Sequence, residues 1–313
     1  MSEQIEAPEV FNPKFVESLL ACPEGHNKSA SDAGSSMIRR KIRENGFSRR
    51  IIPPKTVSKA DLNQWLDSEL PAIIEEMEPN SPGAKSIPFN DTPDSVGYRG
   101  DKFVIRFCLI TTREYVKNIY ELMTYKMDLR QVIIDNALKD IQKTEDARFI
   151  AAIDAMVGSV GGNGDSGHPQ NFQIEGQMTR DSYVEVYSYL EDYDLNNGVI
   201  LMNRKTGKNF LKFDRSEIGG DLAQSLFTEG LQALTEAKIG GIPHIFTIKK
   251  DLVPNNVGYV FAEPKYLGRF YILTDVTMHV KREKNIIRTS AEECIGVSIP
   301  NVAAAARFEF VPA

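Results

Sequence analysis

The chain has 313 residues, of which 42% are hydrophobic and 26% charged, so it can bury a sizeable core without a metal or disulfide staple. A net charge of -6 argues against a globally basic nucleic-acid-binding protein, and the unpaired spacing of three cysteines and four scattered histidines argue against a disulfide framework or a zinc site. No long apolar run is present, so we expect neither a signal peptide nor a membrane contact, and we expect no bound cofactor.

Residues 1–55 form the first segment and carry little of the apolar pattern of a packed core. The stretch CPEGHNKSASDAGSS, which begins at Cys22, has the composition of a linker. We therefore expect partner chains to order this segment.

A basic stretch ends this segment. Its cations include the candidate basic surface Arg39, Arg40, Lys41, Arg43, Arg49 and Arg50. One interpretation is a patch for polyanions, either nucleic acid or an acidic partner protein. The other is a solvated face or a strip of salt bridges between subunits, because a run of charge is weak evidence on its own. The sequence leaves both interpretations open.

A short helix is the first regular element predicted, over about 59–70. Ser58 has the chemistry of its N-cap, and Pro71 would end it.

A β-hairpin is predicted next, at roughly 78–108. Alternation places three side chains of the returning strand on one face, namely Phe103, Ile105 and Phe107. The outgoing strand, around Ile87 and Phe89, has a weaker pattern. A lone two-stranded hairpin is marginally stable in water, so this one needs support from elsewhere.

The strongest local signal is a helix from 112 to 157. Thr111 and Glu114 have the spacing of a capping box, no proline interrupts the segment, and Gly158 can end it. Apolar residues recur on one helical face, at Ile134, Leu138, Ile141, Phe149, Ile153 and Met156. Such a helix would be about 65–70 Å long. A compact protein of this size has a radius of gyration of roughly 20 Å, so we expect a flat or elongated shape.

A glycine-rich loop at 158–170 marks a domain boundary, and helix and strand signals interleave beyond it. Helices are predicted around 179–193, 204–213 and 221–227. Strands are predicted at GVILMN, GIPHIFTI, GYVFAE and RFYILTD, followed by extended segments to the end of the chain. The predicted class is α+β.

Two motifs in the glycine-rich loop lack the neighbouring elements or residues that their chemistry requires. Gly162, Gly164 and Gly167 match G-x-G-x-x-G, but a dinucleotide site needs a strand before the glycines and a helix after them, and here a helix precedes. Ser166 resembles the nucleophile of trypsin-like proteases, but the only histidine upstream is His26, in the N-terminal segment. A serine hydrolase using Ser166 is kept as a distant alternative.

The other titratable candidates are two carboxylate pairs and two histidines, Glu145–Asp146, Glu292–Glu293, His244 and His279. Neighbours on a helix diverge by about 100°, so the first pair does not converge on one substrate, and the second is predicted as strand-face charge. The histidines lie in apolar, strand-like segments and are predicted to be structural. Nothing assembles a nucleophile, a base and an oxyanion hole, so no catalytic residue is expected.

The order of these elements resembles that of a known family. The closing segment carries most of the likeness, through Phe270, Asp275, a turn near Asn285, Arg288, Gly296-Val297, Pro300 and an alanine-rich last strand. LKDIQKTEDARFIAAIDAMVG resembles the end of a spine helix, and NDTPDSVGYRGDKF resembles an extended loop. Together, residues 50–313 resemble the major capsid protein of tailed bacteriophages, the Hong Kong ninety-seven type of shell fold.

The resemblance implies an N-terminal arm, an extended hairpin called the E-loop, a spine helix, a peripheral domain and an axial domain. The expected divisions are 1–55 for the arm, 56–77, 105–160 and 271–300 for the peripheral domain with its spine helix, 78–104 for the E-loop, and 161–270 with the final strand 301–313 for the axial domain. The E-loop would lie across a neighbouring subunit through Ile87, Phe89, Tyr98, Arg99 and Phe103.

The function that this resemblance implies is non-enzymatic. Copies of the chain would assemble as pentamers and hexamers into an icosahedral head around double-stranded DNA, in the cytoplasm of a bacterial host, and would form the capsid of the virion. Expected partners are a separate scaffold protein, a portal, decoration proteins and the packaged DNA, held without sequence specificity. The basic arm would line the inner wall or contact the scaffold. An encapsulin-type nanocompartment shell has the same fold and is the main alternative.

Overall fold

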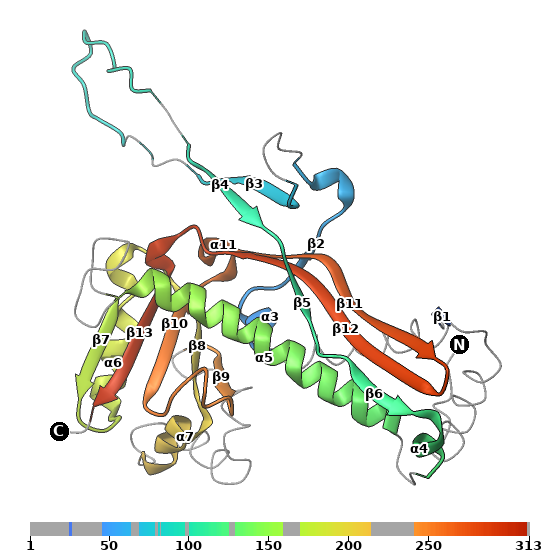
Figure 1. The fold of residues 1–313 in the computed structure, drawn as a ribbon. Helices are drawn as coiled ribbons and strands as arrows, with labels where there is room; N and C mark the ends of the chain where they lie inside the picture. The colour runs from blue at the N-terminus through green and yellow to red at the C-terminus, as the bar shows by residue number, and fades with distance from the viewer. Residues whose placement is uncertain are drawn as a thin grey trace, which may run out of the picture.

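The computed structural model describes residues 25–26, 46–63, 69–78, 81, 83–97, 100–124, 129–158, 170–213 and 241–311. They form a long sheet, a five-stranded sheet and a long helix that packs on strands of both, and a two-stranded ladder projects from one side with a loop beyond it (Figure 1). The fold is α+β and its shape is elongated, as the sequence predicted.

The long sheet is built on one hairpin. Its six strands are β11 (Arg269–Glu283), β12 (Ile286–Ser298), β5 (Cys108–Thr111) and β6 (Tyr115–Asn118) beside β12, and β1 (Gly25–His26) and β2 (Lys55–Thr56) beside β11. Lys284 and Asn285 form the two-residue turn between β11 and β12, with Lys284 at a φ of 52°, so the predicted turn near Asn285 is confirmed. At about 3.3 Å per residue, the 15 residues of β11 extend over about 50 Å.

Helix α5 (Leu129–Val157) is shorter than predicted, because the segment before it does something else. Residues 115–118 form β6, and α4 (Ile119–Thr124) is a separate short helix. The β6 strand pairs with residues 286–289 of β12, and this sheet pairing outweighs the local helix pattern. With 29 residues, α5 is about 43 Å long.

The capping box predicted for this helix is therefore wrong. Thr111 lies in β5, and the carboxylate of Glu114 forms an ion pair with Arg288 at 3.1 Å. The predicted end of the helix is confirmed, because Gly158 has a φ of 77° and its N–H donates to the carbonyl of Asp154 at 3.2 Å.

The apolar face predicted for α5 is confirmed. The six residues predicted on this face are all buried in the main core, namely Ile134, Leu138, Ile141, Phe149, Ile153 and Met156. This core continues into both sheets, so α5 joins them through one apolar layer.

The second sheet contains both parallel and antiparallel pairs. Its order is β7 (Asn171–Glu175), β13 (Ala305–Val311), β10 (Val257–Ala262), β8 (Asn197–Asn203) and β9 (His244–Thr247). Every residue of β10, its central strand, is buried. Its connections hold α6 (Arg180–Ser188), α7 (Arg204–Gly207), α11 (Pro264–Leu267) and the 3₁₀ turns Glu191–Tyr193, Lys208–Lys212 and Val302–Ala304. The helices predicted around 179–193 and 204–213 are confirmed in these elements, and the helix predicted at 221–227 lies outside the described residues.

The projecting ladder corrects the hairpin prediction. Its strands are β3 (Ala72–Glu76) and β4 (Lys102–Arg106), which pair with Ile73 opposite Ile105. Ile87 and Phe89, expected on the outgoing strand, lie in the loop beyond the ladder, where the described residues have no strand. The alternation had placed the returning strand correctly, but its partner begins before the predicted hairpin.

The predicted helix over 59–70 is also wrong over its described part. Lys59–Asp61 form a single 3₁₀ turn, and Asn63 bridges to Ala72 at the start of the ladder. Residues 64–68 lie outside the described residues. Ser58 does cap the turn, because its N–H and hydroxyl both donate to Asp61.

The ladder rests on a small core of its own. Val57, Ile73, Ile105, Phe107 and Tyr271 bury one another there. A Cβ on Gly296 would lie 3.1 Å from Ile105 and 3.2 Å from Phe107, so glycine lets the ladder cross closely over β12. This contact supplies the support that a two-stranded hairpin needs.

Candidate functional site: a projecting loop and a buried ionic cluster

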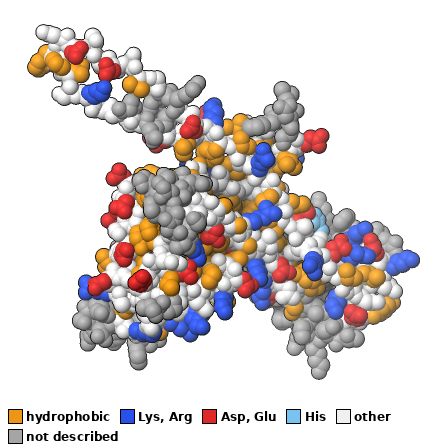
Figure 2. Space-filling view, turned by 60° about the vertical axis from the view of Figure 1, so that its left-hand side comes forward, with side chains coloured by type: hydrophobic (Ala, Val, Ile, Leu, Met, Phe, Trp, Pro, Cys, Tyr) orange, Lys and Arg blue, Asp and Glu red, His pale blue; other side chains and the backbone are white. Residues whose placement is uncertain are grey.

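The loop between β3 and β4 stands away from the rest of the molecule (Figure 2). Ile87 and Val96 are exposed, and Phe89 is completely so. An ion pair between Lys85 and Asp94, at 2.8 Å, is the one salt bridge within the described part of this loop, and both side chains are more than 70% exposed. Exposed pairs of this kind contribute little, so the described loop has little holding it in this chain alone.

The predicted E-loop residues fall into three groups. Ile87 and Phe89 are exposed on the loop, whereas Tyr98 and Arg99 lie outside the described residues. Phe103 is half-buried on β4 and packs against the small core under the ladder. It therefore also anchors the ladder to its own chain, and its predicted contact with a neighbour stays a prediction.

The residues of the predicted basic surface also fall into three groups: exposed, buried and outside the described residues. Arg50 is exposed, and Arg39, Arg40, Lys41 and Arg43 lie outside the described residues. Arg49 is only 6% exposed, so its assignment to a basic surface is wrong.

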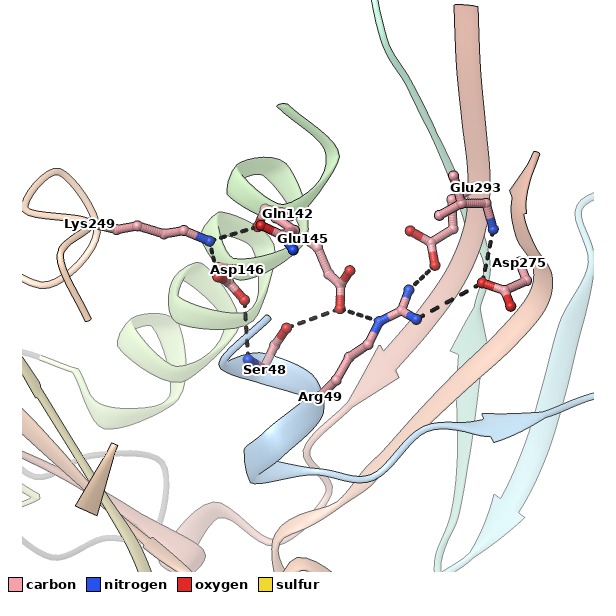
Figure 3. A network of polar contacts seen from close by, with 9 residues as sticks. Ser48, Arg49, Gln142, Glu145, Asp146, Lys249, Asp275 and Glu293 are labelled. Carbon is pink, nitrogen blue, oxygen red and sulfur yellow. Dashed lines mark hydrogen bonds and ion pairs between the residues drawn. The ribbon is translucent and has the colours of Figure 1, made fainter. Parts of the chain in front are cut away.

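Arg49 lies instead at the centre of a buried ionic cluster (Figure 3). The cluster consists of Ser48, Arg49, Gln142, Glu145, Asp146, Lys249, Asp275 and Glu293. Arg49 is carried by α3 (Ser48–Ile51), and its Nε donates to Oε1 of Glu145 at 2.9 Å. Its Nη2 donates to Oε1 of Glu293 on β12, and its Nη1 lies 4.0 Å from Oδ1 of Asp275 on β11. The guanidinium also lies 5.8 Å from the ring centre of Phe270.

The other half of the cluster fixes the backbone of α3 to α5. The N–H of Ser48 donates to Oδ1 of Asp146 at 3.1 Å, and its hydroxyl donates to Oε1 of Glu145 at 3.0 Å. Lys249 donates to Oδ2 of Asp146 at 2.5 Å and to the carbonyl of Gln142 at 3.4 Å. The cluster therefore joins α3, α5, the long hairpin and the loop that follows β9.

Carboxyl groups outnumber cations in this cluster. Among its buried atoms, Oε2 of Glu145, Oε2 of Glu293 and Nε2 of Gln142 have no hydrogen-bond partner. Burial raises the pKa of both carboxyls, that of Glu293 to about 8, and the charge of Arg49 only partly offsets this effect. One guanidinium thus faces three carboxyl groups, two of them removed from water.

The prediction for the two carboxylate pairs is half correct. Glu145 and Asp146 do diverge, toward Arg49 and Lys249 respectively. Glu293 was expected to be strand-face charge, but its side chain is fully buried, whereas Glu292 on the opposite face bonds to His279 at 2.8 Å. The sequence did hold a signal for this, because the alternation of β12 aligns Glu293 with the buried Ala291 and Ile295.

His244 is structural, as predicted, and belongs to a second buried polar group. Its Nδ1 donates to the carbonyl of Ile242 at 2.9 Å, so its Nε2 is the acceptor for the hydroxyl of Tyr183. The hydroxyl of Tyr187 in turn bonds to that of Tyr183. Burial lowers the pKa of His244 to about 4, which keeps the imidazole neutral.

No catalytic or metal centre is apparent in the described residues. They contain no group of three or more metal-ligating side chains, and none of their helices is long and apolar enough to cross a membrane. An open hollow of about 270 Å³ lies beside the end of α5, but its polar groups already bond to one another, with Tyr259 donating to Asp154 and Arg307 to Asn171. Ser166 and the glycine motif around it lie outside the described residues.

Solved structures place this architecture among viral shells. The chain matches the mature capsid of bacteriophage PhiM1 (TM-score 0.57, 9% identity, 82% of this chain and 85% of that one) and the capsid of cyanophage P-SCSP1u (TM-score 0.57, 13% identity, 84% and 87%). It also matches a virus-like particle from Pyrococcus furiosus (TM-score 0.56, 13% identity, 90% and 99%). No protein-family model matches the sequence, and the comparison with curated proteins gives no match.

At these identities the likeness concerns the fold. The long hairpin sheet, the spine helix, the five-stranded sheet and the projecting ladder define a viral shell fold. It is the fold of tailed-phage capsid subunits, the Hong Kong ninety-seven type, which the sequence predicted.

Proposed function

We propose that this chain is the major shell protein of a tailed-phage head. The observation that carries the proposal is the match to phage capsid structures over more than four-fifths of the chain. The role is structural and non-enzymatic. Copies of the chain assemble as pentamers and hexamers into an icosahedral shell that becomes the capsid of the virion.

The projecting loop is the proposed contact between neighbouring subunits. Phe89, Ile87 and Val96 expose apolar side chains that a monomer leaves in water. The ladder holds the base of the loop firmly, so the loop can reach another copy without losing its attachment to its own chain. Tyr98 and Arg99 are proposed to belong to the same contact. Many moderate contacts of this kind give a shell strength through multivalency.

The proposed domain division follows the two sheets. The long sheet with α5 is the peripheral domain, from 56–77, 105–160 and 271–300. The five-stranded sheet is the axial domain, from 161–270 and 301–313, and all five of its strands fall within those ranges. Axial domains meet at the fivefold and sixfold centres, while residues 1–55 form the arm and 78–104 the E-loop.

The remaining partners are proposed from the same resemblance. A separate scaffold protein, a portal and decoration proteins act with the shell, which assembles in the bacterial cytoplasm and encloses double-stranded DNA without sequence specificity. A net charge of -6 suits a container that must not grip its cargo. Arg39, Arg40, Lys41 and Arg43 are proposed to face the inner wall or the scaffold.

A nanocompartment shell is the second candidate function. The observation that favours it is a match, over 90% of this chain and 99% of that one, to a Pyrococcus furiosus virus-like particle, which is not named as a phage capsid. Both candidates predict closed particles, and they differ in the content of those particles. A serine hydrolase remains the distant alternative, and labelling of Ser166 by a serine-reactive phosphonate would support it.

The deciding experiment is particle mass by light scattering or sedimentation, with absorbance at 260 and 280 nm recorded on each species. Pentamers, hexamers or megadalton particles of the 35.0 kDa chain are expected, and co-migrating DNA would favour the phage head over the nanocompartment. A monomer or dimer that never assembles, with crowding agent or scaffold present, would contradict the shell function.

The loop contact has its own test in Phe89→Asp. The Phe89 side chain is completely exposed, so subunit stability should stay within about 0.5 kcal/mol of wild type while assembly is lost. Lys85→Ala, which breaks only an exposed ion pair of the same loop, is the matched control and should assemble. Normal particles from Phe89→Asp would remove the loop tip from the proposed interface.

The arm is tested by the triple variant Arg39→Glu, Arg40→Glu and Arg43→Glu. Reversing these charges should alter particle yield or DNA content, because both proposed contacts are with polyanions. Unchanged particles with normal DNA content would support the solvated-face interpretation.

A further inference from the structure

A group of exposed cations lies at one end of the five-stranded sheet. Strands β8 and β9 are parallel, with Asn203 opposite Thr247, so the segments that follow them leave the sheet at the same end. Neither 197–213 nor 243–250 contains an aspartate or a glutamate. The exposed cations of these two segments form the α7 patch, namely Arg204, Lys205, Lys208, Lys212 and Lys250.

The backbone that carries the α7 patch is fixed to the body of the protein. The side chain of Asn203 accepts from the N–H of Lys205 at 2.9 Å and donates to the carbonyl of Val253 at 2.7 Å. The hydroxyl of Thr206 accepts from the N–H of Asn256 at 2.8 Å. Asn203 and Thr206 are both buried, so these bonds hold α7 against the loop that follows β9.

Helix α7 and the 3₁₀ turn Lys208–Lys212 have one buried side and one exposed side. The buried residues are Thr206, Gly207 and Phe210. On the exposed side, Arg204 and Lys208 lie one turn apart, about 6 Å along the axis. Lys212 is exposed at the end of the 3₁₀ turn, about 8 Å further on. The positive charges therefore follow one another along a convex surface.

The cations of the α7 patch are not neutralised within the chain. None of them forms an ion pair among the residues that the structure describes. Asp251, which is next to the patch in sequence, pairs instead with Lys143 at 2.9 Å. The far end of the long hairpin differs, because Arg288 there pairs with both Glu114 and Glu283 at 3.1 Å. The α7 patch thus leaves its charge available for an anion outside the chain.

The chemistry of the α7 patch favours a phosphate backbone as that anion. All but one of its cations are lysines, which bind phosphate as point charges and require no fixed direction. Lysine is depleted in protein–protein interfaces, whereas phosphate contacts use it widely. A duplex carries one charge for about every 1.7 Å of its axis, so several phosphates can lie over this row of cations.

We propose that the α7 patch contacts the phosphate backbone of the double-stranded DNA inside the shell. That the bound duplex is the packaged DNA rests on the proposed function, whereas binding of a duplex by the patch does not. The contact is weak and independent of base sequence, because each copy offers few cations on a chain with a net charge of -6. Repetition of the patch over many copies would align the DNA along the wall.

The test is binding of a fluorescently labelled duplex of about 20 base pairs to full-length, unassembled subunits, at about 50–200 mM salt. Wild type is compared by fluorescence anisotropy with the triple variant Arg204→Gln, Lys208→Gln and Lys212→Gln. The slope of log affinity against log salt concentration should become shallower by up to about 2.7, because each phosphate contact contributes about 0.9. The three side chains are exposed, so the variant should fold as wild type does.

The matched control is the triple variant Lys102→Gln, Lys265→Gln and Lys281→Gln. It removes the same total charge from exposed lysines that each form an ion pair within the chain. It should keep the wild-type slope, because these lysines lie outside the patch. An equal change in both triple variants would mean that net charge alone governs binding, and would reject the α7 patch.

A second measurement uses wild type only and applies even where a variant does not fold. Acetylation of lysines by a small reagent is measured by mass spectrometry with and without the duplex. Bound DNA should protect the patch lysines, namely Lys205, Lys208, Lys212 and Lys250. The control lysines Lys102 and Lys265 should react equally in both samples, and unprotected patch lysines would overturn the proposal.

An acidic protein is the other partner that the charge could attract. Leu211 and Ile248 are exposed apolar side chains of the same segments, and a protein partner would bury them. A poly-glutamate peptide that binds more tightly than the duplex, and less tightly to Leu211→Ser, would therefore overturn the DNA contact. A duplex should bind Leu211→Ser as it binds wild type.

Particle mass separates this proposal from the proposed function. Wild-type subunits that assemble but bind no duplex at about 50 mM salt would reject the DNA contact and leave the shell function intact. Wild-type subunits that bind the duplex through the α7 patch but never assemble would reject the shell function. The patch would then remain a duplex-binding surface without a packaged genome as its partner.

Discussion

Two buried polar groups in this chain are stabilised in different ways. The ionic cluster around Arg49 has more carboxyl groups than cations and joins segments 96 to 244 residues apart in the sequence. The chain of hydrogen bonds from Tyr187 through Tyr183 and His244 to the carbonyl of Ile242 is neutral, and each described bond pairs a donor with an acceptor. One group connects distant parts of the fold, and the other stiffens a single region of the five-stranded sheet.

The difference shows which buried contacts of this fold depend on protonation and which do not. A neutral, fully paired network has one stable arrangement, because breaking any bond leaves a buried group unsatisfied. A charged cluster with spare acceptors depends on its protonation state, so its strength varies with conditions. In this protein the variable group joins α3, α5, the long hairpin and the loop after β9, and the invariant one joins α6 to the five-stranded sheet.

The largest expected effect comes from removing the cation, with Arg49→Met. It leaves the buried Glu145 without the cation that pairs with it and removes the donor of Glu293, which should lower the free energy of unfolding by about 3–5 kcal/mol. Urea denaturation of isolated subunits at pH 7 measures this loss. Arg50→Met is the matched control, since Arg50 is exposed, and it should change stability by less than about 0.5 kcal/mol.

Adding Glu145→Gln and Glu293→Gln to Arg49→Met should recover part of the loss, because uncompensated charge is its main cause. No recovery would mean that packing around the guanidinium, including its contact with Phe270, accounts for the effect.

The ionic cluster and the His244 network should differ clearly in how each makes the free energy of unfolding depend on pH. His244 has a pKa of about 4 in the fold against 6.5 ordinarily, so its contribution is present above pH 6.5 and is lost as the pH falls toward 4. Glu293 behaves oppositely, with its contribution present below about pH 4.5 and lost as the pH rises toward 8. The two titrations oppose each other between pH 4.5 and 6.5.

Each variant removes one of the two titrations, so the pH dependence of its stability should show the other. Between pH 4.5 and 6.5, the stability of Glu293→Gln should rise relative to wild type by roughly 2–3 kcal/mol, and that of His244→Phe should fall relative to wild type by a similar amount. Urea midpoints at half-unit pH steps measure both slopes. Parallel profiles for the two variants would refute the opposed assignment.

A smaller effect is expected from Tyr183→Phe. It leaves Nε2 of His244 without its donor in a fully buried site, which should cost about 1–3 kcal/mol. Tyr187→Phe removes the outer bond of the same chain from a half-buried side chain and should cost about 0.5–1.5 kcal/mol. Thermal unfolding of both variants at pH 7 gives the order, and a larger loss for Tyr187→Phe would contradict it.

The sequence predicted those parts of the fold that repeat with a clear period. The apolar face of α5 was predicted because helix spacing reflects the packing directly, whereas the turn near Asn285 came from the family resemblance. The start of α5 was not, because β6 is a strand only through its pairing with β12, which lies some 170 residues later in the chain. Strand β3 was missed for the same reason, since its partner is separated from it by a long loop.

The candidate site was harder to predict, because its chemistry depends on convergence. Arg49 belonged to a basic run and gave no local sign of burial, while its partners Glu145 and Glu293 are about 96 and 244 residues away. Only the alternation of β12 pointed to a buried Glu293, and a lone carboxylate on an apolar face needs a cation that the sequence does not identify. The intersubunit contact predicted for Ile87 and Phe89 came from the family resemblance and stays a prediction.

The smallest effect is also the most informative about the ionic cluster as a unit. Ser48→Ala removes one bond to Glu145, of 3.0 Å, and should cost about 1 kcal/mol by urea denaturation. Ser188→Ala, which removes an exposed bond to the carbonyl of Glu185, is the control and should cost less than about 0.5 kcal/mol. If Arg49 and Ser48 hold α3 together, Ser48→Ala should cost much less in the Arg49→Met background, where α3 has already lost its main attachment. Additive losses would mean that the two halves of the cluster act independently, and α3 would then be attached to the body at two separate points.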